Sequence, residues 1–125
     1  MNTTSVEGAK SQKMLEKSRP HVLTICTNRL MDIQEKAGFF IPLRDCFINE
    51  SSGQVHVVFD VGAGVKGDKS ASQKFFDLLK KIAAEEVPNQ SEINGVATFK
   101  DVASFARSIS SLNSIYAANG YGIRA

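Results

Sequence analysis

Residues 55–70 read VHVVFDVGAGVKGDKS and combine the clearest strand signal of the chain with a glycine-rich turn and the start of a helix. Side chains alternate between the two faces of a strand. Val55, Val57, Phe59 and Val61 therefore share one face, and His56, Val58 and Asp60 share the other. This alternation predicts a strand of an antiparallel sheet whose valine-rich face covers the core.

The segment before this strand predicts a β-hairpin. Arg44–Asn49 is a second β-prone run, and the polar turn Glu50–Gly53 separates it from Gln54–Val61. Further upstream, Phe39–Leu43 is a compact apolar cluster. Pro42 restricts this cluster to an edge strand or an extended segment, because proline cannot donate to a strand ladder.

Helical periodicity marks the segment before the apolar cluster. A helix is predicted from about Ser18, a candidate N-cap, to Gly38, a residue typical of the C′ position. Its apolar residues recur at helical spacing: Leu23, Cys26, Leu30, Ile33 and Ala37. The β-branched run Val22–Thr27 leaves a strand open as the alternative for the start of this segment.

Two further helices are predicted after the glycine-rich turn. The first covers about residues 70–86, and its apolar side consists of Phe75, Phe76, Leu78, Leu79, Ile82 and Ala83. The second covers about residues 99–118 and follows Thr98–Asp101, which resembles a capping box. A solvated face is expected for its four serines, Ser104, Ser108, Ser111 and Ser114. A short strand is predicted between the two helices, at Ile93–Ala97.

These elements predict an α+β fold. It consists of an N-terminal helix, an antiparallel β-hairpin with one or two further short strands, and two C-terminal helices packed on one face of the sheet. The 125 residues suit a single domain, predicted over residues 10–125, with residues 1–9 as a flexible N-terminal tail.

The net charge, the cysteines and the apolar content of the chain argue against several classes of function. A net charge of +2 is weaker than the concentrated basic patch typical of nucleic-acid-binding proteins. Cys26 and Cys46 stand far apart and outside any zinc-ligand spacing, so we expect no metal site. The absence of an apolar run of about 20 residues argues against membrane insertion. A reducing, cytoplasmic location is expected, since no secretory leader is evident at the start of the sequence.

The turn Gly62–Ser70 contains a G-x-G-x-x-G pattern and allows three interpretations. A dinucleotide-binding fingerprint would need a βαβ unit and a second parallel strand, which a hairpin does not provide. A phosphate-binding P-loop would need lysine directly after the last glycine, but Asp68 is inserted there and opposes an anion. The structural interpretation is favoured: the glycines reverse the chain, and Asp68 or Ser70 caps the next helix.

No nucleophile motif accompanies the titratable residues. His56 and Asp60 share a strand face, but no further member of an acid–base or metal constellation is evident in the sequence. We therefore expect neither catalytic residues nor a cofactor.

The predicted function is a small non-catalytic protein-interaction module, such as an adaptor, an inhibitor or an assembly component, that binds another protein or self-associates. An uncovered strand edge favours such contacts. The candidate partner contacts are Phe39, Phe40, Ile41, Lys66, Asp68 and Lys69. The alternative is a phosphate- or nucleic-acid-binding module that uses the loop 62–70 with the N-terminal lysines Lys10, Lys13 and Lys17.

Overall fold

The computed structural model describes residues 21–62 and 64–119 and confirms the α+β prediction. A helix over residues 21–37, here the N-terminal helix, comes first. The later elements are β1 (Phe39–Phe40), β2 (Leu43–Ile48), β3 (Val55–Phe59), β4 (Lys66–Gly67), α2 (Lys69–Ala84), β5 (Val96–Phe99) and α3 (Val102–Ala118). The predicted tail and the three N-terminal lysines lie outside the described residues.

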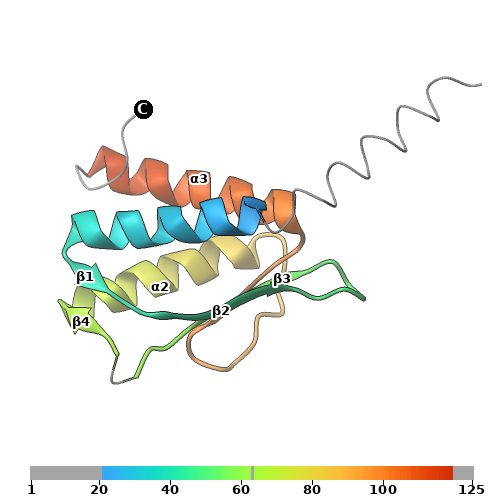
Figure 1. Cartoon of the computed structure of the whole chain (residues 1–125), viewed down its shortest axis with the longest axis horizontal. Helices are drawn as coiled ribbons and strands as arrows, with labels where there is room; N and C mark the ends of the chain where they lie inside the picture. The colour runs from blue at the N-terminus through green and yellow to red at the C-terminus, as the bar shows by residue number, and fades with distance from the viewer. Residues whose placement is uncertain (1–20, 63, 120–125) are drawn as a thin grey trace, which may run out of the picture.

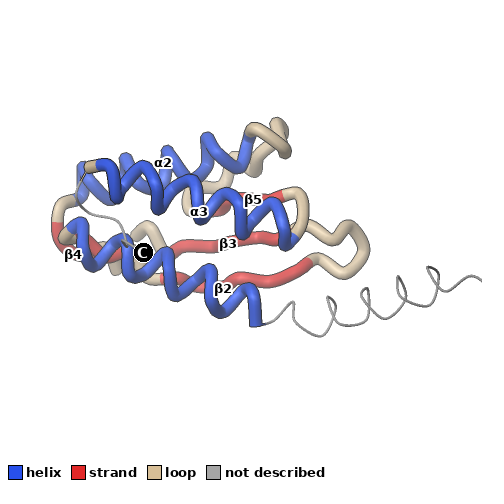
Figure 2. The backbone as a smooth tube through the Cα atoms, turned by 90° about the horizontal axis from the view of Figure 1, so that it is seen from above, coloured by secondary structure: helices blue, strands red, loops and turns tan. Residues whose placement is uncertain are grey.

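The helices form one layer over a small antiparallel sheet. Figure 1 shows the N-terminal helix, α2 and α3 on the same side of β2 and β3, and Figure 2 shows the three helices running alongside one another. The strand order is β2-β3-β5, and β1 and β4 form a separate two-stranded ribbon. No helix in the described part of the chain is long and apolar enough to cross a membrane.

The predicted hairpin is present as β2 and β3. Asn49 N–H donates to the Gln54 carbonyl at 2.8 Å, and the Asn49 side chain accepts from the Ser51 amide, which closes the polar turn. Val55, Val57 and Phe59 are buried, as their alternation predicted, because the three helices cover that face of β3.

Residues 22–27 are helical, which resolves the alternative that their β-branched side chains left open. Cys26, Leu30 and Ile33 recur at helical spacing and are buried against the sheet, so tertiary burial of this stripe outweighs the weak local preference for strand. Gly38 ends the helix at φ +85°, and its N–H donates to the Gln34 carbonyl at 3.0 Å.

The start of the last helix differs from the prediction. Phe99 belongs to β5, where it pairs with Val55 and is fully buried, so the chain stays extended through Thr98 and Phe99. The N-cap is Asp101, whose carboxylate accepts from the Ser104 amide at 2.7 Å. Ser104 and Ser108 are buried, so the solvated face predicted for the four serines is wrong for these two.

Phe75 of α2 lies at the centre of the core. It is fully buried, and its ring meets Phe39 of β1 at 5.3 Å, Phe59 of β3 at 6.4 Å and Tyr116 of α3 at 5.8 Å between centroids. All three pairs are edge-to-face, the favoured arrangement for aromatic quadrupoles. One side chain therefore connects four elements.

The outer edge of β5 is closed by a side chain. The Gln90 amide accepts from the Thr98 N–H at 2.9 Å and donates to the Thr98 carbonyl at 2.7 Å, as a neighbouring strand would. An open edge is a template for pairing with another chain, so this amide protects β5 at that point.

The substitution Gln90→Ala should leave the Thr98 N–H and carbonyl without their hydrogen bonds to the Gln90 amide. It should lower the free energy of unfolding by about 1–2 kcal/mol. The Thr98 amide should also exchange faster with solvent. Urea denaturation and hydrogen exchange measure the two effects. Gln73→Ala, which removes one exposed contact to Asp77, is the control. Equal stability losses in the two variants would contradict the role of Gln90.

Candidate functional site

The site forms where β1 meets β4. Phe39 pairs with Gly67 and Phe40 pairs with Lys66 in an antiparallel ribbon of two residues per strand. The sequence predicted the Phe39–Leu43 cluster and the loop 62–70 as separate contact surfaces, and the ribbon brings them together. The combination is a product of the tertiary structure.

Phe39 and Phe40 face opposite ways, as neighbouring residues of a strand must. Phe39 is buried, and its ring packs on Phe75 in the core. Phe40 keeps 41% of its surface exposed, although it is a large apolar side chain. The buried ring anchors the strand, and the exposed ring remains available for contact.

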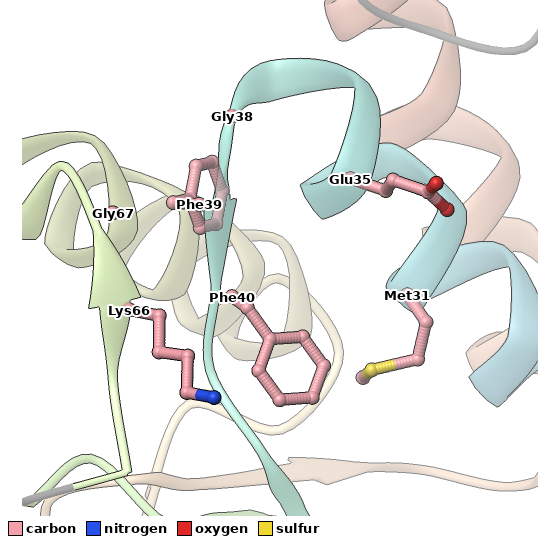
Figure 3. A pocket seen from close by; sticks show the side chains of 7 residues that line it. All are labelled: Met31, Glu35, Gly38, Phe39, Phe40, Lys66 and Gly67. Atoms are coloured by element: carbon pink, nitrogen blue, oxygen red, sulfur yellow. The ribbon is translucent and has the colours of Figure 1, made fainter.

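A hollow of about 400 Å³ lies beside Phe40. Its walls come from the end of the N-terminal helix, from β1 and from β4: Met31, Glu35, Gly38, Phe39, Phe40, Lys66 and Gly67. Figure 3 shows the Phe40 ring between the side chain of Lys66 on one side and that of Met31 on the other. The hollow thus has an apolar centre.

Among the described residues that line the hollow, one charge of each sign lies on opposite sides of Phe40. Lys66 projects from β4, and Glu35 projects from the N-terminal helix one turn beyond Met31 (Figure 3). Both side chains belong to exposed residues, and neither forms an ion pair within residues 21–62 and 64–119. Their charges are therefore available to a binding partner.

The six predicted contacts have different places in the structure. Phe39, Phe40 and Lys66 line the hollow, and Phe39 and Ile41 are buried. The Ile41 N–H donates to the Gln34 side chain at 2.6 Å, which fixes the chain just after β1. Lys69 is exposed at the first position of α2.

Asp68 is the N-cap of α2. Its carboxylate accepts from the Ser70 N–H at 2.9 Å and from the Ala71 N–H at 3.1 Å. These are the donors that a helix N-terminus would offer to a phosphate, and the carboxylate already occupies them. The structural interpretation of the cap is confirmed, and this contact argues against anion binding at the α2 terminus.

The spacing of the glycines follows from close packing. A Cβ on Gly67 would lie 2.5 Å from the Gly38 oxygen and 2.9 Å from the Phe39 Cα, and Gly67 also has φ +82°. A Cβ on Gly64 would lie 2.8 Å from the Pro42 ring. Two glycines of the pattern that resembles a nucleotide fingerprint therefore serve close packing: Gly67 lets β4 approach β1, and Gly64 lets the preceding loop approach Pro42.

Two lining side chains were missed by the sequence interpretation, those of Met31 and Glu35. Both lie on one flank of the N-terminal helix, next to the buried stripe of Leu30 and Gln34. Their helical spacing of four residues was a usable signal, but only the fold shows that this flank faces β1.

The same flank continues into a second hollow of about 340 Å³. This one lies between the N-terminal helix and β2, and it is lined by Leu23, Thr24, Thr27, Leu43 and Cys46. Burial raises the pKa of the Cys46 thiol to about 12 and also raises that of Cys26. At neutral pH both remain thiols, which are poor nucleophiles.

His56 and Asp60 do not form an acid–base pair. His56 Nδ1 lies 3.1 Å from the Thr98 hydroxyl, and its ring stacks on Phe47 with centroids 5.2 Å apart. The Asp60 carboxylate instead accepts from the Gly62 amide at 3.3 Å. No group of three or more His, Cys, Asp or Glu side chains in the described ranges could hold a metal ion.

Gly67→Ala should lower the free energy of unfolding by at least about 2 kcal/mol, because the new methyl group meets β1 backbone and the left-handed conformation disfavours alanine. Gly62→Ala is the matched control, since its Cβ would meet only the Asp60 carboxylate at an ordinary 3.5 Å. Urea denaturation of both variants measures the difference. Similar stabilities for the two would show that the close approach of β4 to β1 is not required.

Comparison with known proteins adds no relationship to this geometry: no family model, curated protein or solved structure matches the chain.

Proposed function

We propose that this protein is a small, non-catalytic interaction module that binds a partner protein at the hollow around Phe40. The observation that carries the proposal is an exposed aromatic ring beside an apolar hollow, held by a ribbon that is anchored in the core. Aromatic side chains placed in this way commonly supply most of the energy of a protein interface.

The shape of the site suits a side chain of a partner. About 400 Å³ lies at the lower end of the range for ligand sites. A protruding apolar side chain can enter beside Phe40 and Met31, while Lys66 and Glu35 stay at the rim. Rim charges contribute more to specificity and to the rate of association than to affinity.

The chemistry of the described residues favours binding over catalysis. The two thiols are protonated at neutral pH, and His56 and Asp60 engage different neighbours. The positions that could accept phosphate at the start of α2 are filled by Asp68. These contacts support an interaction role, such as that of an adaptor, an inhibitor or an assembly component.

Phe40→Asp should strongly weaken partner binding while the fold is kept, because the substitution places a charge at the apolar centre of the site. Loss of a central aromatic anchor typically costs at least about 2 kcal/mol, which is roughly a 30-fold loss of affinity. The measurement is quantitative affinity capture from the native cell with the full-length chain as bait.

Ile93→Asp is the control for this experiment. Ile93 is 69% exposed in the loop before β5, so the substitution introduces the same charge at an exposed apolar position outside the site. Circular dichroism verifies that both variants are folded. A partner retained equally by wild type and Phe40→Asp would contradict the proposed site.

A further inference from the structure

We propose that the partner at the Phe40 hollow is a second copy of this chain, bound about a two-fold axis. Each Phe40 ring enters the hollow of the other protomer, and each Lys66 faces the other protomer's Glu35. The inference rests on the proposed function, since it names the occupant of the same site.

Self-complementarity of charge is the basis for this choice. A two-fold interface places the same patch on both sides, so residue i meets residue j and residue j meets residue i. Lys66 and Glu35 lie on opposite sides of Phe40 (Figure 3), and a two-fold axis through the centre brings each charge to its opposite. Among these four side chains, the rotation gives two pairings of opposite charge and none of like charge.

Shape supports the same arrangement. The site offers both a protrusion, the exposed Phe40 ring, and a recess, the hollow beside it. Two such surfaces can interlock, and the two rings then meet at the axis, where aromatic pairs gain energy beyond that of area burial. Neither Lys66 nor Glu35 has to break an ion pair with a described residue before it enters the interface.

Another hollow on the molecule lacks this self-complementarity of charge. It lies between α2 and the end of α3 and is lined by Lys74, Leu78, Ile115, Tyr116 and Asn119. Among the described residues that line it, Lys74 is the charged one, so a two-fold axis there would bring two lysines toward each other without a compensating carboxylate from these residues. Charge therefore favours the Phe40 hollow as the self-association site.

The size of the interface sets the expected affinity. A stable interface buries about 800 Å² on each partner, which is more than one hollow provides. The second hollow, at Leu43 and Cys46, continues along the same flank of the N-terminal helix and can extend the contact. We expect a dimer with a dissociation constant on the order of micromolar.

The test uses charge reversal in the full chain, measured by sedimentation velocity from micromolar to millimolar concentration. Lys66→Glu and Glu35→Lys should each weaken dimerisation at least about tenfold, because both ion pairs become contacts between like charges. The double variant should dimerise like wild type. An equimolar mixture of the two single variants should form a heterodimer, since each charge then faces its opposite again.

Two controls match the changes in net charge. The controls are Lys81→Glu and Glu92→Lys, and both residues are exposed. Lys81 lies 12 positions after Lys69, near the end of α2 that is far from β4, and Glu92 lies in the loop before β5. Neither control should change the dimerisation constant. Circular dichroism verifies that every variant is folded.

A wild-type chain that stays monomeric over the whole range overturns the inference. A dimer that is insensitive to the single reversals, or a mixture that fails to form a heterodimer, overturns this arrangement of the protomers. If wild type is monomeric but Phe40→Asp still loses a captured partner, the proposed function stands and only the second copy is wrong. If Phe40→Asp changes neither capture nor dimerisation, both proposals fail.

Discussion

The packing of Phe75 is the interaction on which the other elements depend. Its fully buried ring contacts one aromatic side chain each from β1, β3 and α3, so the helix layer, the sheet and the β1–β4 ribbon share a single point. Each edge-to-face pair contributes about 0.5–1.5 kcal/mol beyond the burial of area. Because folded domains are stable by only about 5–15 kcal/mol, this cluster is a substantial part of the total.

The aromatic cluster around Phe75 also explains how so short a ribbon can keep the exposed Phe40 side chain in a fixed position. Two paired residues on each strand would be marginal alone. Phe39 ties β1 to Phe75, the Gln34 side chain holds the Ile41 amide, and the absence of a side chain at Gly67 lets β4 lie against the β1 backbone. Three different contacts thus keep Phe40 in place while its ring remains exposed, and a pre-organised anchor binds with a smaller entropic cost.

Several polar groups that a sequence could suggest as reactive are committed to structure. Asp68 and Asp101 cap helices, Asp60 stabilises a turn, and His56 contacts Thr98. At the Phe40 hollow, Lys66 and Glu35 form no ion pair with another described residue, and such charges suit recognition across an interface. This distribution supports the proposed role in binding, because Asp68, Asp101, Asp60 and His56 are engaged in structural contacts.

The sequence by itself determined the class of fold, the hairpin, the helices and, as candidates for the cap of α2, Asp68 and Ser70. These features depend on periodicity and on local hydrogen bonds, both of which can be recognised within a few residues. It did not determine where α3 begins, because burial of Phe99 extended β5 into the apparent capping box. Only the tertiary structure decided the site: Met31, Glu35, Phe40 and Lys66 come from three elements, and the pairing of β1 with β4 that unites them is too short to leave a periodic signal. The glycine pattern at residues 62–67 was visible from the start, but the reasons for Gly67 and Gly64 were the approach of the β1 backbone and of the Pro42 ring, which are distant in sequence.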